Sequence, residues 1–360
     1  MIYNKDEKAV IFIDGFLNLE YKHKRAILDL YDSPSLIFKN YDIACKYLKE
    51  SGNERYVNSF KLAINEGFSD KLIEKYEKRK LTVLTEISEN YPFGLLDLPI
   101  NPICLYCKGN LSLINEEKKF SIVGSRKSLN QYLKLTEDFS KILTENGVTI
   151  VTGVAVGGDL SAIKGGIDSG KLILVLAGGH DFISSEINRD YINKVVENGG
   201  LVISEYPPEV PTLQYHYPIR NRIIAGLSQG TLIVSGSIKS GARHTALFAL
   251  DYGKEIFTFP YTLGALGGEL PNSLIKDGAY LVTELKDITE ILGYNLGLNN
   301  KIELSSEEKL VITSIKNGNV LVDDIIVDTS LKIYELMPIL TALEIKGVLV
   351  NVNANEYVVK

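Results

Sequence analysis

The sequence predicts an α/β protein built around a doubly wound, mostly parallel sheet. Between residues 118 and 293, apolar runs, mostly short, alternate with segments of helical period. Glycine-rich stretches follow several of these runs directly, as at Gly124, Gly153 and Gly178. Such alternation is typical of parallel strands covered by helices on both faces, with ligands bound beyond the carboxyl ends of the strands. We therefore expect the chemistry of this chain at the ends of its strands.

The length and composition indicate a soluble protein of several domains. A chain of 360 residues suggests two or three domains, which we place at residues 1–88, 89–297 and 303–360. Hydrophobic residues make up 45% of the chain and charged residues 23%, as in ordinary globular proteins. We find no apolar run of membrane-spanning length and no secretory leader, and three cysteines fit a reducing compartment. We therefore expect a cytoplasmic protein without membrane contact.

The charge balance restricts how nucleic acid could bind. The net charge of −6 argues against indiscriminate duplex binding driven by counterion release. Between Phe120 and Leu292, 15 Lys and Arg stand against 18 Asp and Glu, a net charge of −3. A DNA-binding surface in this region must therefore be a local pocket rather than a basic face.

The first 88 residues are expected to form a small helical domain. Apolar residues recur at helical spacing, as at Leu17, Tyr21 and Ile27, and polar breaks such as Ser51-Gly52-Asn53 separate the segments. We find no catalytic constellation in this domain. Contact with a partner and packing on the next domain are both open interpretations.

Residues 90–110 are expected to form an extended connector. Pro92, Pro99 and Pro102 favour extended backbone. The segment contains a lone CxxC motif, Cys104 and Cys107, without a second pair of ligands at the spacing that a structural zinc site requires. In extended backbone, residues three apart also point to opposite faces. We therefore predict no metal site.

The strands of the central sheet are expected at the apolar runs. Segments of helical period, such as Tyr132–Leu143 and Ala246–Tyr252, lie between most of them. The predicted strands are 120–123, 148–151, 172–177, 201–203, 231–234, 256–259 and 280–282.

The end of the first of these strands has the features of a phosphate-binding turn. Gly124 follows the strand directly, and Ser125, Arg126 and Lys127 lead into a helix. A glycine lets the backbone approach a ligand, and a helix N-terminus offers unpaired N–H groups to an anion. The guanidinium of Arg126 adds a planar set of donors.

Further strand ends carry similar signals. A glycine-rich loop spans residues 152–159, residues 177–181 are followed by Asn188, and residues 237–245 begin another helix. Arg220 and Arg222 flank an asparagine at the start of an apolar helix, and because arginines are costly to bury, we expect them to face a ligand or an acidic partner. Neither the dinucleotide fingerprint nor the P-loop is present. Phosphate-binding loops spread along one edge favour a nucleic-acid strand over a single nucleotide.

These motifs resemble the DNA-processing protein A family (DprA, also called Smf) from about Tyr91 to Leu292. The string from Arg220 to Ser228 is the specific part of the resemblance. The other matching segments follow in the family's order: Gly124-Ser125-Arg126, the loop 153–159, Ser240-Gly241, Thr245-Ala246, Asn272, Leu274-Ile275 and Gly278-Ala279.

The resemblance implies a Rossmann-like fold that binds single-stranded DNA without sequence preference and without catalysis. Family members protect incoming strands in natural transformation and help load the RecA recombinase, usually as homodimers. We expect no cofactor. Together, the resemblance and the positions of the basic residues predict DNA contacts at Gly124, Ser125, Arg126, Lys127, Gly153, Asn188, Arg220, Asn221, Arg222, Lys239, Ser240, Gly241, Asn272 and Lys276.

The chain departs from the family pattern near the predicted pocket. Gly158 stands where isoleucine is usual and Ile163 where histidine is usual. Ser184-Ser185 replaces a Tyr-Pro pair, and Ser235-Gly236 replaces an acidic residue followed by alanine. Because these changes cluster at the pocket, they affect the expected contacts with DNA rather than the fold. A nucleotide-binding sensor, a nucleotide-cleaving enzyme and a defence or scaffold protein remain the alternatives.

The histidines do not indicate a catalytic site. His180, His216 and His244 are all expected near the loop edge. A catalytic imidazole requires a positioned nucleophile or carboxylate, and the sequence shows none for these residues. We predict no catalytic residue and expect His216 to pack or hydrogen-bond in its turn.

Residues 303–360 are expected to form a winged-helix-like domain. Helices over 307–315 and 332–346 precede a hairpin of 348–350 with 357–359. Residues 305–360 contain 5 Lys against 8 Asp and Glu, and Pro338 interrupts the helix that would read DNA. A protein-contact or regulatory role is therefore favoured over duplex reading, with a packing appendage as the alternative.

Overall fold

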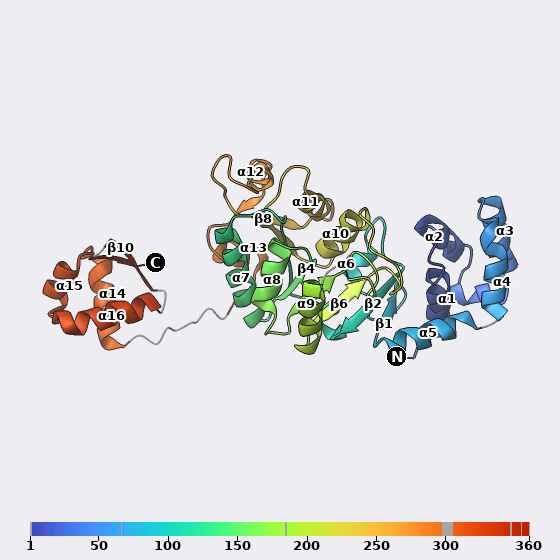
Figure 1. The fold of residues 1–360 in the computed structure, drawn as a ribbon, viewed down its shortest axis with the longest axis horizontal. Coiled ribbons are helices and arrows are strands. Elements are labelled where there is room, and N and C mark those ends of the chain that lie inside the picture. Colours follow the sequence, from blue (N-terminus) through green and yellow to red (C-terminus); the bar gives the residue numbers. More distant parts are fainter. Residues whose placement is uncertain are drawn as a thin grey trace. The chain divides into compact units, whose positions relative to one another are not determined.

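The computed structural model describes residues 2–65, 67–183, 186–296, 305–345, 348–353 and 355–359 (Figure 1). The chain divides into two compact units, Met1–Tyr294 and Asn295–Lys360. Within the described residues, no helix combines the length and the apolar character needed to span a bilayer.

A nine-stranded sheet forms the centre of the first unit, in the order β1-β2-β6-β5-β4-β3-β7-β8-β9 (Figure 1). Strands β3 to β9 are mutually parallel, whereas β2 pairs antiparallel with both β1 and β6. The strands are β1 (Thr82–Thr85), β2 (Cys104–Gly109), β3 (Lys119–Val123), β4 (Thr149–Thr152), β5 (Leu172–Val175), β6 (Leu201–Ser204), β7 (Gly230–Ile233), β8 (Glu255–Thr258) and β9 (Tyr280–Leu281).

The predicted fold class is confirmed, and each predicted strand is present. Two strands contradict the sequence predictions: β1 lies where helix was expected, and β2 lies where a connector was expected. The reason is burial, because residues 103–107 are almost fully enclosed and their backbone must find partners in the sheet. Tyr106, for example, pairs with Ser204 of β6.

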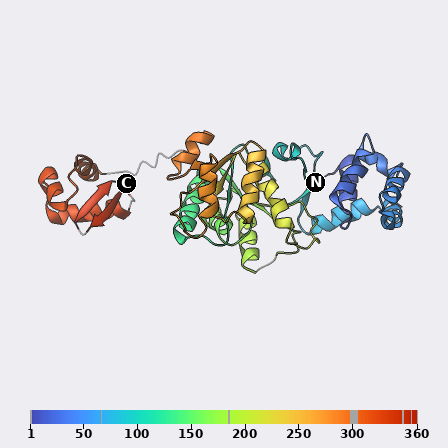
Figure 2. The same cartoon turned by 90° about the horizontal axis from the view of Figure 1, so that it is seen from above.

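Helices cover both faces of the sheet (Figure 2). On one face, Ile223 and Ala246 pack with the strand residues Val123 and Ile233. On the other face, Phe139 packs edge-on against Phe259. The helices of this region are α6 (Phe93–Leu96), η3 (Leu111–Asn115), α7 (Asn130–Glu145), α8 (Gly158–Gly166), α9 (Glu186–Glu197), α10 (His216–Gly226), α11 (Gly241–Asp251), α12 (Glu269–Lys276) and α13 (Lys286–Leu292).

The N-terminal residues are helical as expected up to β1, and they share a core with the sheet. Val83 and Tyr106 of β1 and β2 belong to the same apolar cluster as Phe12 and Phe60. The helices are α1 (Lys5–Asp14), α2 (Tyr21–Asp29), η1 (Pro34–Phe38), α3 (Asp42–Glu50), η2 (Glu54–Tyr56), α4 (Val57–Asn65) and α5 (Phe68–Lys78).

The side chains of the CxxC motif point to opposite faces of β2, as predicted. Cys104 belongs to the core beneath the N-terminal helices, and Cys107 belongs to the core of the sheet. Burial raises the pKa of both thiols, so they behave as small apolar side chains.

The second unit has its own apolar core, which includes Val311, Ile325, Leu340 and Tyr357. Both predicted helices and the hairpin are present, and an additional helix, α15, lies between the helices; Lys346 lies outside the described residues. The winged-helix assignment stays a prediction. The elements are α14 (Ser306–Lys316), α15 (Val322–Thr329), α16 (Ile333–Ile345), β10 (Leu349–Asn353) and β11 (Glu356–Val359).

Candidate nucleic-acid interface

A cavity of about 220 Å³ opens beyond the carboxyl ends of β4 and β5. Three of the residues predicted from the sequence line it: Arg126, Asn188 and Arg220. Among its described lining residues, the charged side chains are these two arginines, and no carboxylate lines the wall. The cavity is therefore suited to an anionic ligand.

The turn after β3 places Arg126 at the cavity while leaving its side chain exposed. The Ser125 amide donates to the carbonyl of Ser235 over 3.0 Å, and the Ser125 hydroxyl donates to the carbonyl of Lys127 over 2.7 Å. These bonds hold the backbone of the turn. The side chains of Arg126 and Lys127 are exposed.

Two glycines allow this turn to meet the start of α8. A Cβ atom on Gly158 would lie 2.7 Å from the Cα atom of Gly124, closer than such contacts allow. The backbones therefore touch without side chains between them. The departure from isoleucine at Gly158 is consistent with this close approach, since a larger residue would force the two segments apart.

The side-chain carboxylate of Asp159 bridges the turn at Gly124 and the glycine-rich loop at residues 152–159. Asp159 Oδ1 accepts from the Gly124 amide over 3.2 Å, and Oδ2 accepts from the Ala155 amide over 3.3 Å. Burial raises the pKa of Asp159, and the neighbouring Arg220 acts in the opposite direction. The backbone donors that were expected to cradle a phosphate at Gly124 are therefore occupied by Asp159.

Gly153 accommodates the side chains of Asp159 and Arg220. A Cβ atom on Gly153 would lie 2.3 Å from Asp159 Oδ2 and 2.6 Å from Arg220 Nη2. Arg220 is 4% exposed, donates from Nε to Asn221 Oδ1 over 3.0 Å and also donates to the carbonyl of Val175. Arg220 thus forms part of the cavity wall and is held by internal partners.

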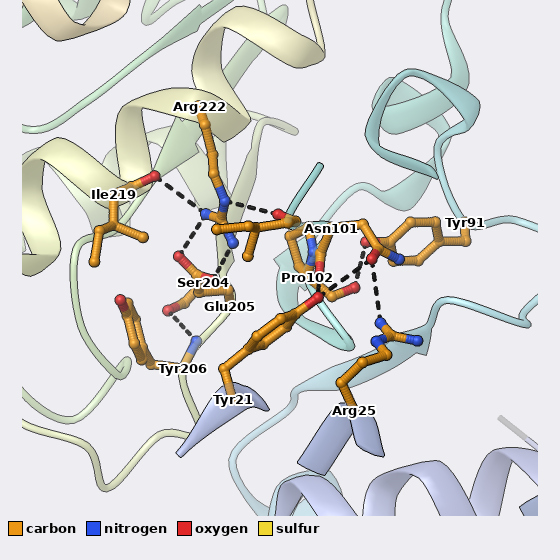
Figure 3. Close-up of polar contacts among 11 residues, drawn as sticks. Tyr21, Arg25, Tyr91, Asn101, Pro102, Ser204, Glu205, Tyr206, Ile219 and Arg222 are labelled. Carbon is orange, nitrogen blue, oxygen red and sulfur yellow. Dashed lines mark hydrogen bonds and ion pairs between the residues drawn. The ribbon is translucent and has the colours of Figure 1, made fainter. Parts of the chain in front are cut away.

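Arg222 does not line the cavity. Its Nη2 lies 2.6 Å from Glu205 Oε2 and its Nη1 2.9 Å from Glu205 Oε1, while Nε donates to the carbonyl of Ile100 over 2.9 Å (Figure 3). Burial alone would lower the pKa of Arg222, but Glu205 outweighs it and the pKa is raised. The expected acidic partner of Arg222 therefore lies within the chain.

Figure 3 also shows polar contacts between α2 and the segment that precedes β2. The Tyr21 hydroxyl donates to the carbonyl of Asn101 over 3.0 Å, and Arg25 forms a bidentate pair with Glu86 at 2.6 and 2.7 Å. Asn101 Nδ2 also donates to Glu86 over 2.7 Å. These contacts attach the N-terminal helices to the sheet.

The predicted asparagines support backbone segments. Asn188 donates to the carbonyl of Val154 over 2.9 Å and lines the cavity. Asn221 donates to the carbonyl of Gly241 over 3.1 Å. Asn272 bonds both the amide and the carbonyl of Tyr261. Of these three asparagines, Asn188 is the one that meets the cavity.

The remaining predicted residues lie outside the cavity, in the loop after β7, at the start of α11 and at the end of α12. The side chains of Lys239 and Lys276 are exposed, as is Gly241, and Ser240 precedes α11 as its N-cap. They do not line the cavity. The Ser125–Ser235 hydrogen bond joins the loop of Lys239 and Ser240 to the turn of Arg126, whereas Lys276 is the last residue of α12. Lys239 therefore lies in a loop that adjoins the turn of Arg126.

The structure describes some of the residues that depart from the family pattern, but not all of them. Ile163, Ser235 and Gly236 are buried. Ser184 and Ser185 lie outside the described residues.

The exposed apolar residues that line the cavity were not among the site residues predicted from the sequence. Phe182 is 47% exposed, Tyr217 is 37% exposed and Val156 is 54% exposed. Phe182 follows the glycine-rich end of β5, and an aromatic residue in such a loop is the signal that could have revealed it. Aromatic faces beside arginines can stack with nucleic-acid bases.

The histidines have structural partners. His216 is buried and stacks on Tyr206 with 4.1 Å between ring centroids, which confirms the expectation that it packs in its turn. His180 Nε2 lies 2.8 Å from the carbonyl of Tyr106 and therefore donates to it as a neutral imidazole. Burial lowers the pKa of His180 to about 4.

This depressed pKa predicts a loss of stability in mild acid. The unfolded chain binds a proton at His180 near pH 6.5, whereas the folded protein does so near pH 4. The free energy of unfolding should therefore decrease as the pH falls from about 6.5 to about 4. His180→Gln keeps a side-chain donor and should weaken this dependence, whereas His244→Gln, at an exposed position, should not. Urea unfolding at several pH values measures the difference, and equal pH dependence in wild type and His180→Gln would contradict it.

Comparison with known proteins identifies relatives over most of the first unit. The family model described as DNA recombination-mediator protein A matches residues 82–293. The Smf protein of Escherichia coli is 39% identical over 210 residues, which cover 58% of this chain and 56% of that protein. The chain thus spans little more than half the length of that relative. The Smf protein of Borreliella burgdorferi is 30% identical over 304 residues, covering 83% of this chain and 93% of that protein.

Solved structures of the same family superpose on the chain. DNA processing protein A of Streptococcus pneumoniae gives a TM-score of 0.65 at 28% identity and covers 81% of this chain and 98% of its own. DNA processing protein A of Helicobacter pylori, whose structure concerns its single-stranded DNA binding mode, gives a TM-score of 0.55 at 27% identity. That comparison covers 60% of this chain and 97% of the Helicobacter protein.

Proposed function

Because this chain belongs to the DNA recombination-mediator protein A family, we propose that it binds single-stranded DNA without sequence preference. The observation that carries the proposal is the cavity beyond β4 and β5, whose charged lining residues are both arginines. Phe182 and Tyr217 are exposed, line the same cavity and can stack on bases. A site with cationic and aromatic side chains suits a strand whose bases are unpaired.

The phosphates are held mainly by side chains. Asp159 occupies the Gly124 and Ala155 amides, so those backbone donors are not offered to a phosphate. Arg126 is exposed at the cavity, Lys127 is exposed beside it in the same turn, and Lys239 is exposed in the loop after β7. Binding through such cations releases counterions and weakens with salt.

Membership of the family supports a wider role, which we propose as well. The chain protects incoming strands and helps load the RecA recombinase onto them in natural transformation or recombination. It acts as a homodimer in the cytoplasm and without catalysis. In support of a non-catalytic role, the histidines beside the cavity, His180 and His216, both bond backbone carbonyls.

Titration of the wild-type protein with labelled oligo-dT and with a duplex of equal length, at two salt concentrations, tests the proposal. We expect tighter binding to the single strand and weaker binding at the higher salt concentration. Preference for duplex, or no binding, would overturn it. Binding of a mononucleotide but not of oligo-dT would instead favour the nucleotide-sensor alternative.

A further inference from the structure

The loop after β5 forms one wall of the cavity and carries Phe182. Its backbone is bonded to the loop after β6: the Gly179 amide donates to the carbonyl of Val210 over 2.8 Å, and the Asp181 amide donates to the carbonyl of Pro208 over 3.1 Å. The His180 ring is bonded to the carbonyl of Tyr106 in β2. The wall is therefore fixed to two neighbouring elements of the sheet.

A third attachment comes from the N-terminal helices. Arg79, directly after α5, donates from Nη2 to Asp181 Oδ2 over 3.0 Å and from Nε to the same oxygen over 3.2 Å. Nη2 of Arg79 also lies 3.2 Å from Glu209 Oε1, and Lys75 Nζ lies 2.8 Å from that oxygen. The end of α5 thus holds both loops that form this wall.

We propose that Arg79 is a positioning residue for the DNA site. It holds the Phe182 wall through Asp181 and thereby makes the N-terminal helices part of the binding apparatus. The inference rests on the proposed function. A wall fixed before the strand arrives loses less conformational entropy on binding, which raises affinity without a contact between Arg79 and DNA.

The geometry favours positioning over direct contact with phosphate. The Arg79 guanidinium meets Asp181 and Glu209, and Nη1 donates to the carbonyl of Lys75 over 3.2 Å. Two carboxylates already neutralise this cation, and the pKa of Arg79 is raised by its hydrogen bonds to Asp181.

The two roles predict opposite effects for Asp181. If Arg79 contacted phosphate, Asp181→Asn would remove a competing carboxylate and strengthen binding. If Arg79 positions the wall, Asp181→Asn should weaken binding as Arg79→Gln does. The double variant should then bind no more weakly than either single variant, because both remove the same contact.

The experiment measures oligo-dT affinity against salt for the full chain and its variants. Arg79→Gln and Asp181→Asn should each bind about two- to fivefold more weakly, the range expected for a partly exposed ion pair. The slope of log affinity against log salt should be unchanged, since no phosphate contact is lost. Arg79→Lys should recover part of the affinity. Arg25→Gln is the matched control, because it breaks a bidentate pair with Glu86 that also links the N-terminal helices to the sheet but does not touch the wall.

Three results would overturn the inference while leaving the proposed function intact. The first is stronger binding by Asp181→Asn, and the second is a shallower dependence of log affinity on log salt for Arg79→Gln. The third is unchanged affinity in both variants. Hydrogen exchange of the Gly179 and Asp181 amides gives a second readout without DNA. Faster exchange in Arg79→Gln than in Arg25→Gln supports the positioning role, and equal exchange contradicts it. If wild type itself fails to bind oligo-dT, the proposed function and the DNA-positioning role both fail, and the exchange result then concerns only the attachment of the wall.

Discussion

An Arg222→Ala variant is expected to lose about 3–5 kcal/mol of the free energy of unfolding, the range found when one partner of a buried ion pair is removed. Arg222 is 4% exposed, and its two Nη atoms lie 2.6 and 2.9 Å from the carboxylate of Glu205. The substitution leaves that carboxylate largely enclosed without a cation. It also leaves the carbonyl of Ile100 without its donor (Figure 3).

Urea unfolding followed by hydrogen exchange in peptides from α10 measures this effect within the first unit. The matched control is the double variant Arg222→Met/Glu205→Leu, which removes both charges and should recover much of the stability. Wild-type stability together with lost DNA binding in Arg222→Ala would contradict the structural role and favour a DNA contact.

Asp159→Asn is expected to destabilise the same unit by a similar amount, about 3–5 kcal/mol, because Arg220 is left buried without its anionic neighbour. The Asp159 carboxylate accepts from the Gly124 and Ala155 amides and lies beside Arg220 across Gly153. An asparagine provides one acceptor in place of two, so one of these amides also loses its partner.

The double variant Asp159→Asn/Arg220→Met serves as the control and should be less destabilised than the sum of the two single variants. The same unfolding experiment measures both. Additive effects would show that the two side chains are independent. Arg220→Ala is unsuitable as a simple DNA-contact test, because it disturbs this buried pair.

The parallel part of the fold could be predicted because its strands are buried on both faces. Runs such as Phe120-Ser121-Ile122-Val123 therefore stand out in the sequence. Strands β1 and β2 could not be predicted in the same way. They pair antiparallel and need no crossover helix, and only the four-residue α6 lies between them. The prolines before β2 indicated only extended backbone.

The candidate site was predicted in part. Arg126, Asn188 and Arg220 line one cavity, and their contact with DNA stays a prediction. Arg220 and Arg222 are two positions apart on α10, and because each residue turns a helix by about 100°, they point in nearly opposite directions. Helical spacing alone therefore predicts that these two arginines lie on different sides of α10. The role of Asp159 could not be predicted from the sequence, because it depends on the contact between Gly124 and Gly158 in three dimensions.

The salt dependence of oligo-dT binding by Arg126→Ala tests the central claim most directly. Arg126 is exposed at the cavity, and the turn around it is held by backbone and serine contacts that the substitution leaves in place. Losing one phosphate contact should weaken binding and reduce the magnitude of the slope of log affinity against log salt by about 0.7, the change expected per phosphate contact on a single strand. Lys134→Ala removes an exposed cation from α7 that pairs with Asp138, and it should leave both quantities unchanged. An Arg126→Ala variant that is folded and matches wild type in affinity and slope would contradict the assignment of this cavity as the DNA site.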